Sequence, residues 1–166
     1  MSIIGKKWFV VYTLSRNEKK VKEYFDKIKI ENFLPLIKII KFYSDRKKKV
    51  EVPLFPSYIF INITWSRHLE ALNTPGVVGF VRFNSEPAII SESDLLFIKN
   101  LINEEVDLTV ENRIYKKGQN VKINYKNLTD YVGTVIEYRG SKRLVIGIAA
   151  LNKTIVLPAS YLEFII

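Results

Sequence analysis

The chain has 166 residues, of which 48% are hydrophobic and 26% charged, a balance typical of a folded globular protein and not of a disordered one. It has no cysteine and a single histidine, His68, which excludes a disulfide framework, a thiol nucleophile and a metal site of cysteines or clustered histidines. The formal net charge of +9 indicates a polyanionic partner, with nucleic acid as the leading candidate.

The sequence shows neither a membrane span nor a signal peptide. No run of about 18 apolar residues is present. The N-terminus, MSIIGKKWFVVY, lacks a long apolar core followed by a small-residue cleavage site. We therefore expect a cytoplasmic protein with no membrane contact.

The N-terminal part of the chain begins with a strand and a helix. Residues 8–14, WFVVYTL, predict a strand buried on both faces because the run is apolar and β-prone. Ser15 and Glu18 fit a capping box at the start of a helix. The helix presents an apolar stripe formed by Val21, Phe25 and Ile28. Its opposite face, either a solvated surface or a phosphate contact, carries Lys19, Lys20, Lys22 and Lys27.

A basic hairpin is predicted next. Residues 33–63 indicate two or three strands with a turn at SDRKKK, where Ser44–Lys49 carries four positive charges and one negative. Lysines at such a position protect an exposed strand edge from aggregation, or they contact phosphates, and the sequence leaves both explanations open. In the stretch VPLFPSYIFI, two prolines remove backbone donors just before a strand. Alternation places Tyr58 and Phe60 on one face of that strand and Ile59 and Ile61 on the other.

Three further elements complete the N-terminal layer. A short helix is predicted at 66–72 before the turn NTPGV, and VVGFVRF predicts a strand at 77–83. In SESDLLFIKNLIN, Ser91 and Asp94 fit a second capping box. The apolar stripe of that helix is Leu95, Ile98 and Ile102. The order of elements predicts an α+β domain with an antiparallel sheet and helices.

The C-terminal part shows strand signals alone. Residues 104–113, EEVDLTVENR, are polar and predict a linker, although Val106, Leu108 and Val110 alternate as in an edge strand. Beyond them come NVKINY, VGTVIEY, RLVIGIAA, TIVLPA and LEFII, separated by turn-prone groups. Five short strands in this length favour a small all-β SH3-like barrel.

Several motifs carry a resemblance to a known family. In order, they are WFVVYT, the basic amphipathic helix, PLFPSYIFI, PGVVGFVRF followed by PAII, and the C-terminal strands. Over nearly its full length the chain resembles the NusG family of transcription elongation factors, particularly specialised antitermination paralogues such as RfaH and the UpxY proteins. The resemblance implies a NusG N-terminal-like domain at 1–104, a linker at 105–113 and a KOW-like SH3-type barrel at 114–166.

The resemblance also implies a surface and a partner. In the family, an apolar patch of the N-terminal domain docks on the clamp helices of RNA polymerase, so that the enzyme resists pausing. Alignment of the motifs places this patch at Tyr12, Phe55, Tyr58, Phe60, Phe83 and Leu95. The alternative is that all six side chains are core, although the tyrosine hydroxyls favour a surface with one hydrated edge.

The same alignment implies contacts to DNA of the elongation complex, including its non-template strand, or to a second polymerase element. These fall on Arg16, Lys20 and Lys27 in the first helix and on Arg67, His68 and Thr74 near the short one. Cations on phosphates supply affinity without sequence information. The family often has Gly or Asn where this chain has Ser57, and we expect serine to fit there with an ordinary backbone conformation.

In the family, the C-terminal domain contacts a ribosomal protein or Rho, and in RfaH it refolds as a helical hairpin. Here the segment is rich in Val, Ile, Thr and Tyr, and Gly133, Gly140 and Gly147 interrupt any helix. A β-barrel is therefore the predicted resting state.

These observations favour a non-enzymatic monomer without a cofactor. No P-loop, dinucleotide-binding turn or nucleophile elbow is present. We expect a transcription antitermination or elongation factor that binds the polymerase clamp helices and suppresses pausing or termination, at specific long operons. The alternative is an RNA-binding or ribosome-associated KOW-type protein, because the chain is basic throughout.

Overall fold

A computed structural model of the protein describes residues 4–104, 108–112, 119–123, 131–138 and 141–158. The chain forms two compact units, Met1–Glu92 and Ser93–Ile166, and each is described by itself. The boundaries predicted from the sequence, at 1–104, 105–113 and 114–166, assign the helix that starts at Glu92 to the first domain, whereas almost all of it falls in the second compact unit. The domain boundaries therefore stay a prediction.

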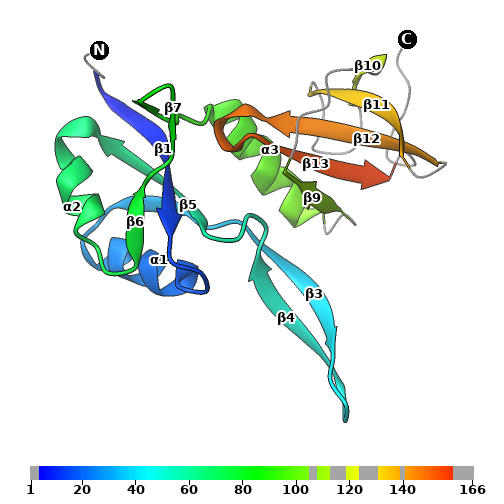
Figure 1. Ribbon diagram of the computed structural model, residues 1–166, viewed down its shortest axis with the longest axis horizontal. Helices are drawn as coiled ribbons and strands as arrows, with labels where there is room; N and C mark the ends of the chain where they lie inside the picture. Colours follow the sequence, from blue (N-terminus) through cyan, green and yellow to red (C-terminus); the bar gives the residue numbers. More distant parts are fainter. Residues whose placement is uncertain (1–3, 105–107, 113–118, 124–130, 139–140, 159–166) are drawn as a thin grey trace. The chain divides into compact units, whose positions relative to one another are not determined.

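A four-stranded antiparallel sheet forms the first unit (Figure 1). Its strands, in spatial order, are β2 (Glu31–Phe33), β5 (Tyr58–Thr64), β1 (Lys6–Thr13) and β6 (Val77–Phe80). The register of the two central strands places Phe9 opposite Ile61 and Val11 opposite Ile59. The strand predicted from the apolar run is confirmed and residues 8–11 are buried on both faces, but Tyr12 and Leu14, which were predicted to be buried, are exposed.

The core of this unit lies between one sheet face and helix α1 (Glu18–Lys27). Val21 and Phe25 of the predicted helical stripe are fully buried, and Ile28 is partly buried. The strand residues that alternate onto this face are Phe9, Val11, Ile59, Ile61 and Ile63. The short helices η1 (Trp65–Arg67) and α2 (His68–Leu72) follow β5. Each fully buried large apolar side chain stabilises the fold by about 1.5–3 kcal/mol relative to an exposed one.

The start of α1 differs from the sequence prediction. Asn17 is the N-cap residue, and no side chain caps the helix. The Glu18 carboxylate accepts a hydrogen bond of 2.8 Å from the backbone amide of Ser57 instead of closing a capping box with Ser15. The predicted capping box is therefore wrong, because a distant amide takes the carboxylate that the local pattern assigns to the helix terminus.

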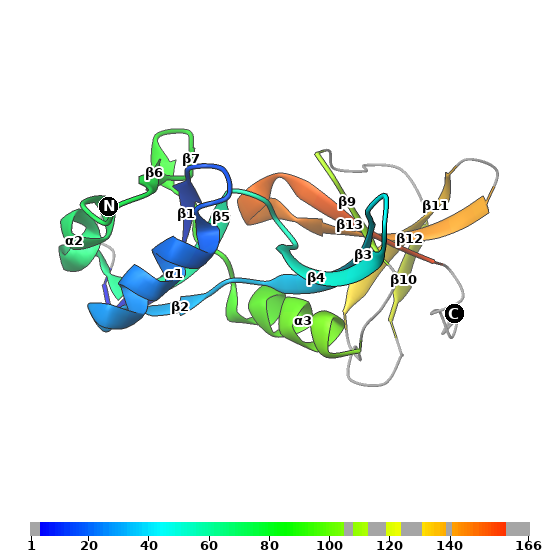
Figure 2. The same ribbon diagram turned by 90° about the horizontal axis from the view of Figure 1, so that it is seen from below.

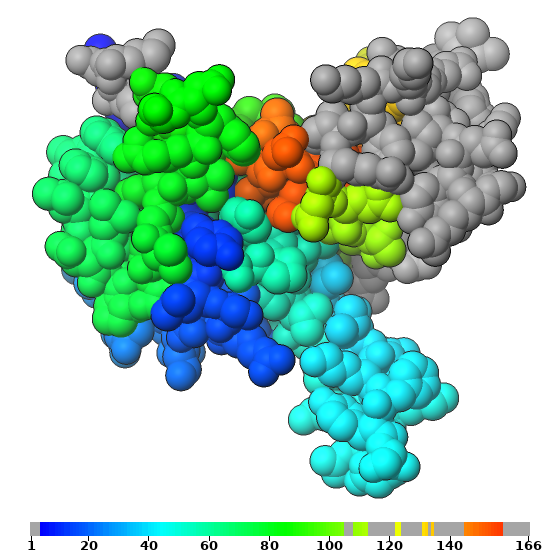
Figure 3. All heavy atoms as spheres, viewed as in Figure 1, coloured from blue at the N-terminus to red at the C-terminus, as the bar shows by residue number. Residues whose placement is uncertain are grey.

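Two hairpins extend the first unit. Strands β3 (Leu36–Phe42) and β4 (Lys47–Pro53) form a two-stranded ribbon that projects from the four-stranded sheet (Figures 1 and 3). The Tyr43 amide donates to the Arg46 carbonyl oxygen at 2.8 Å, so the hairpin turns within the predicted SDRKKK region. The second hairpin joins β7 (Arg82–Phe83) to β8 (Glu86–Pro87), and the strand predicted at 77–83 is interrupted at Val81.

The second unit contains a helix and a five-stranded antiparallel sheet. The helix is α3 (Glu92–Asn103), and the strands, in spatial order, are β10 (Gln119–Lys122), β11 (Val132–Tyr138), β12 (Ser141–Ile148), β13 (Lys153–Pro158) and β9 (Thr109–Glu111). A 3-10 turn, η2 (Ala149–Leu151), joins β12 to β13. Among the described residues β9 pairs with β13 at one end of the strand order, so Thr109–Glu111, a part of the segment predicted as a linker at 105–113, is an edge strand of this sheet. The last predicted strand, LEFII, lies outside the described residues.

Helix α3 lies alongside the strands of its own unit (Figure 2). The rings of Phe97 and Tyr131 are 4.4 Å apart between centroids, and the Tyr131 hydroxyl donates to the Ser93 carbonyl oxygen. Leu95 and Ile98 of the predicted stripe are buried. Burial raises the pKa of the Tyr131 phenol above its ordinary value.

Two kinds of feature are absent from the described residues. No helix among them is long and apolar enough to cross a membrane. No group of three or more His, Cys, Asp or Glu residues in the same ranges is arranged to hold a metal ion.

Candidate functional site

The sheet face opposite the α1 core is lined by aromatic side chains. The antiparallel register pairs Tyr12 directly with Tyr58, and Phe60 with both Val10 and Phe33. Residues paired in this way share a face, whereas Ile59 and Ile61 point to the core. The predicted alternation along β5 is therefore confirmed.

Tyr12 and Tyr58, here called the tyrosine pair, form the exposed part of this face. Their ring centroids are 5.4 Å apart at an interplanar angle of 66°, an edge-to-face contact. Tyr12 is 42% exposed and Tyr58 is half-buried. Burial raises the pKa of the Tyr58 phenol, and the neighbouring Tyr12 adds to the shift. Both hydroxyls thus belong to a surface that is apolar in its body and able to make hydrogen bonds at its edge.

Two buried phenylalanines, Phe55 and Phe60, flank Tyr58 in the sequence, and Phe60 shares its sheet face. Phe55 and Phe60 meet edge to face with centroids 6.2 Å apart, and Phe33 stacks on Phe60 at 6.2 Å. Phe55 and Phe60 are both fully buried. They therefore hold the sheet face in shape, while the tyrosines occupy its accessible part.

A strained turn sets the position of Tyr58. Ser57 has φ 67, in the left-handed region, so the ordinary backbone expected at this residue is not found. Three hydrogen bonds hold the turn. Glu18 accepts from the Ser57 amide at 2.8 Å, the Thr13 amide donates to the Ser57 carbonyl oxygen at 2.9 Å, and the Tyr58 amide donates to Phe55 at 3.1 Å. The turn therefore joins α1, the end of β1 and the start of β5 at one point beside the tyrosine pair.

Glu18 is the residue in this site that the sequence prediction missed. Its side chain is buried, with 5% of its surface exposed, although it stands at the start of a helix rich in lysine. A local capping box explains the same spacing equally well. The sequence offered one signal for this contact. The family often has Gly or Asn at the position of Ser57, and these residues tolerate the positive φ of a turn whose amide needs an acceptor outside the strand ladder.

The other two predicted patch residues lie on different elements. Phe83 is 42% exposed on the β7–β8 hairpin, where Asn84 and Ser85 both adopt positive φ at the turn. Leu95 is buried in α3, in the second compact unit. The structure thus brings four of the six residues together at one sheet face, with Tyr12, Tyr58 and Phe60 on it and Phe55 in ring contact with Phe60.

The predicted cationic residues of the first helix are exposed. Arg16 precedes α1 with φ 63, and Lys20 and Lys27 lie on its outer face. The Lys27 ammonium lies 5.3 Å from the centroid of the Tyr24 ring. Of the other lysines on this face, Lys22 forms an ion pair with Asp26 at 2.8 Å, which lowers the pKa of that carboxyl.

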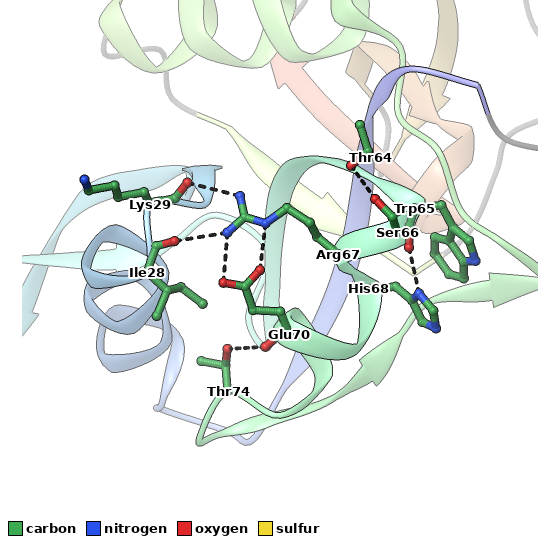
Figure 4. Close-up of polar contacts among 9 residues, drawn as sticks. All are labelled: Ile28, Lys29, Thr64, Trp65, Ser66, Arg67, His68, Glu70 and Thr74. Carbon is green, nitrogen blue, oxygen red and sulfur yellow. Dashed lines mark hydrogen bonds and ion pairs between the residues drawn. The ribbon is translucent and has the colours of Figure 1, made fainter.

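Arg67, His68 and Thr74 make internal contacts around the short helices (Figure 4). Arg67 forms two hydrogen bonds with the Glu70 carboxylate, at 2.6 and 2.9 Å, and donates to the carbonyl oxygen of Ile28 at 3.1 Å. It thereby connects α2 to the end of α1, and its bonds lower the pKa of Glu70. A further bond joins Arg67 to the Lys29 carbonyl oxygen.

The other two residues of this group are similarly engaged. The His68 ring stacks on Trp65 at 4.6 Å between centroids, and its Nδ1 lies 2.7 Å from the Trp65 carbonyl oxygen. Thr74 is buried, and its hydroxyl donates to the Glu70 carbonyl oxygen at 3.2 Å. These contacts give all three residues a structural role in the first unit.

Comparison with known proteins agrees with this architecture. The family model described as NusG, transcription termination factor nusG, matches residues 6–99. The transcription termination/antitermination protein NusG of Rickettsia felis is 31% identical over 161 residues, covering 89% of this chain and 83% of that protein. The NusG protein of Chlamydia pneumoniae is 28% identical over 142 residues, covering 79% and 78%.

A solved NusG structure is similar to this chain in fold. NusG from Thermotoga maritima has a TM-score of 0.56 and 24% sequence identity to this chain, covering 98% of this chain and 99% of that one. The shared architecture is an antiparallel sheet with helices. Because the family model spans more than half of the sequence and the Rickettsia protein matches most of it, the chain belongs to the NusG family of transcription termination and antitermination factors.

Proposed function

We propose that this protein is a non-enzymatic transcription elongation and antitermination factor that binds the clamp helices of RNA polymerase through the tyrosine pair. The observation that carries the proposal is the edge-to-face contact of Tyr12 and Tyr58 on the sheet face opposite the core. Large, rigid aromatic side chains with a polar tip are enriched among the residues that dominate binding energy. A pair of helices offers a surface of matching kind, because packed helices present apolar ridges with polar flanks.

The other four predicted patch residues are expected to contribute less to polymerase binding than the tyrosine pair. Phe83, also 42% exposed, adds an apolar contact from the β7–β8 hairpin. Phe55 and Phe60 are buried and pack on each other beside Tyr58 in the sequence, and the contact predicted for Leu95, which is buried in α3 of the second unit, stays a prediction. Their substitution is expected to act through the shape of the surface more than through lost contacts.

Nucleic acid of the elongation complex, including the non-template DNA strand, is the second proposed partner. Arg16, Lys20 and Lys27 support this part because all three are exposed at or on α1. The contacts predicted for Arg67, His68 and Thr74 stay a prediction, and each of these side chains already has an internal partner. Such cation contacts would add affinity that falls as salt rises.

Residues 114–166, within the second unit, are proposed to form a KOW-like SH3-type barrel that contacts a ribosomal protein or Rho. The support is the antiparallel order β10-β11-β12-β13-β9 of that unit and the NusG relatives that span most of the chain. We further propose that the protein acts in the cytoplasm as a monomer, at a few long operons, in the manner of the RfaH and UpxY paralogues. Mapping its occupancy across the genome tests this last point, because presence on most transcribed genes would make it a general factor.

A direct experiment tests the tyrosine pair. The variants Tyr12→Ala and Tyr58→Ala are compared with the parent in binding to purified RNA polymerase and in a pausing assay. Each substitution is expected to weaken binding by about 10- to 30-fold, the range for truncating an aromatic side chain at the centre of an interface. Leu69→Ala is the matched control, because Leu69 is 60% exposed on α2 and outside the proposed surface.

Two results would overturn the proposal. If folded Tyr12→Ala and Tyr58→Ala proteins bind polymerase as tightly as the parent, the surface is wrongly assigned. If the parent does not bind polymerase but shifts labelled RNA with a steep salt dependence, the alternative function as an RNA-binding or ribosome-associated protein is correct.

A further inference from the structure

The tip of the β3–β4 hairpin combines a high positive charge with exposed aromatic rings. Residues 41–49, here called the hairpin tip, contain five cations (Lys41, Arg46, Lys47, Lys48 and Lys49) and one carboxylate (Asp45), a net charge of +4. Every residue of this segment is exposed. Phe42 is 73% exposed and Tyr43 is 51% exposed, so two large rings lie in solvent at the end of the ribbon.

The pairing of the two strands concentrates this charge. Lys41 lies directly opposite Lys48, and like charges at directly paired positions destabilise a sheet. Lys49 lies opposite Ile40 and Lys47 opposite Phe42, so none of the three lysines of β4 faces a carboxylate across the ladder. A ribbon under selection for stability alone would alternate the signs of its cross-strand pairs.

Both faces of the ribbon carry the same combination of groups. On one face Phe42 pairs with Lys47, whose ammonium lies 5.1 Å from the ring centroid. On the other face Tyr43 pairs with Arg46 through the hydrogen bond that closes the turn, and Lys41 and Lys48 follow it. Each face therefore offers one ring with cations beside it.

Protection of the strand edge from aggregation explains the lysines of the hairpin tip but not its exposed aromatic rings. Lysines on an exposed strand edge discourage pairing with another chain. Exposed aromatic residues have the opposite effect, because apolar rings on a free ribbon promote association. Edge protection therefore does not explain why the two rings at the hairpin tip are exposed. A function that uses both the rings and the lysines would explain the whole segment.

We propose that the hairpin tip binds single-stranded nucleic acid. Bases stack on Phe42 and Tyr43, and the neighbouring cations neutralise the phosphates that link those bases. Proteins that bind single strands combine aromatic stacking surfaces with a basic track in this way, because every base has a π face and every linkage a charge. Single-stranded DNA and single-stranded RNA share this chemistry, and the experiment distinguishes them.

Two other polyanions fit the tip less well. In a duplex the bases are already stacked and paired, so rings at the tip of a ribbon have no free base face to cover. An acidic protein surface would complement the charge but leaves Phe42 and Tyr43 without a specific role. The rings thus favour unpaired bases over both alternatives.

The proposal goes beyond the polymerase contact and does not depend on it, so it is tested without polymerase. Fluorescence anisotropy measures binding of the full-length protein to labelled 12-nucleotide single strands of DNA and of RNA, and to a DNA duplex, across a salt series. Phe42→Ala and Tyr43→Ala are each expected to weaken single-strand binding by at least about fivefold. Lys48→Ala is expected to reduce the slope of log affinity against log salt by about 0.7.

Matched variants control for general effects. Leu69→Ala removes an exposed apolar side chain on α2, and Lys7→Ala removes an exposed cation from β1. Both are expected to leave single-strand affinity within about twofold of the parent. Retention of the native circular dichroism spectrum by the hairpin variants shows that loss of binding is local.

The outcomes separate the three partners. Preference for one single strand, with loss on Phe42→Ala, supports the proposal and identifies DNA or RNA as the partner. Equal binding of duplex and single strand with no effect of Phe42→Ala or Tyr43→Ala overturns it. Full displacement by polyglutamate with no effect of either ring substitution also overturns it and indicates an acidic protein surface.

Discussion

The central β1–β5 pair and the β3–β4 hairpin are both antiparallel and rich in β-branched residues, but their environments are very different. The central strands carry nearly continuous apolar runs, whereas lysines interrupt the apolar residues of the hairpin strands. Ile59, Ile61 and Ile63 are almost completely buried beneath α1, whereas Ile40 of the hairpin is 54% exposed. The difference comes from the cover that α1 gives the central strands and from the lysines that interrupt the apolar residues of the hairpin. The four-stranded sheet therefore supplies stability to the first unit, and the hairpin keeps its side chains available to a partner.

The largest expected change in stability comes from replacing one phenylalanine in each of these two regions. Phe9→Ala is expected to lower the free energy of unfolding by about 3–5 kcal/mol, because Phe9 is fully buried and its ring packs against Trp65 and Phe80. Phe42→Ala is expected to change it by less than about 0.5 kcal/mol. Urea unfolding followed by tryptophan fluorescence measures both, since Trp8 and Trp65, the two tryptophans of the chain, lie in the first unit. Equal losses would mean that the hairpin is part of the core.

Two glycines of the sheet region provide the next test. A Cβ on Gly76, which has φ +89, would lie 2.9 Å from Cγ2 of Val21. Gly76→Ala is therefore expected to lower the free energy of unfolding by about 2–4 kcal/mol, through strain and collision with α1. Gly79→Ala in β6, the strand that begins just after Gly76, is the control, because nothing lies within 4 Å of its Cβ position. A loss in Gly79→Ala as large as that in Gly76→Ala would show that α1 is not what makes the position intolerant.

The contact between α1 and the turn before β5 gives a smaller effect. Glu18→Ala leaves the amide of Ser57 without its acceptor, and we expect a loss of about 2 kcal/mol in the free energy of unfolding. Glu18→Gln keeps an acceptor oxygen and is expected to lose less than half of that. Exchange of the Ser57 amide with solvent, measured by NMR, should be faster in Glu18→Ala alone. Equal exchange in both variants would contradict the assigned bond.

Relief of backbone strain at the same turn is expected to stabilise the protein slightly. Because Ser57 adopts φ 67, Ser57→Gly removes a cost of about 1 kcal/mol, part of which is cancelled by the greater freedom of glycine in the unfolded chain. The net gain is about 0.5 kcal/mol. Ser66→Gly in η1, where φ is not positive, is expected to lower stability by a similar amount. Thermal unfolding of the two variants should therefore shift in opposite directions.

The smallest stability effect belongs to the hairpin. Lys48→Glu converts the Lys41–Lys48 pair into one of opposite charge, which is expected to raise the free energy of unfolding by about 0.2–0.5 kcal/mol at low salt. The same variant is expected to bind single strands more weakly than the parent. Stability and binding would thus change in opposite directions, and a parallel loss of both would contradict a ribbon whose charges serve a partner.

Periodicity predicts most of the elements of the first unit. The apolar run at 8–14 and the stripe of Val21, Phe25 and Ile28 are local patterns that predict a strand and a helix. The structure contains both elements, and they pack against each other in the core. The hairpin turn at 44–49 follows from local charge and turn preference in the same way. Elements were predictable wherever their signal lies within one turn or one strand of sequence.

The missed features depend on residues far apart in the sequence. Glu18 and Ser57 are 39 positions apart, so no window of local sequence reports their hydrogen bond. Arg67 likewise carries a charge typical of a phosphate contact, yet it binds carbonyl oxygens at the end of α1. The burial of Phe55 and Phe60 depends on how their rings pack on one another and on Phe33, which alternation alone does not determine.

The hydrogen bond from Ser57 to Glu18 also has a consequence for communication within the first unit. Glu18 begins the helix proposed to contact nucleic acid, and Ser57 immediately precedes Tyr58 of the tyrosine pair. A displacement of α1 must therefore either break this bond or move the turn, and with it the Tyr58 ring. We expect chemical shifts of Tyr58 to respond when an oligonucleotide binds to α1, and to lose that response in Glu18→Ala. Occupancy of one partner would then be reported at the surface that meets the other.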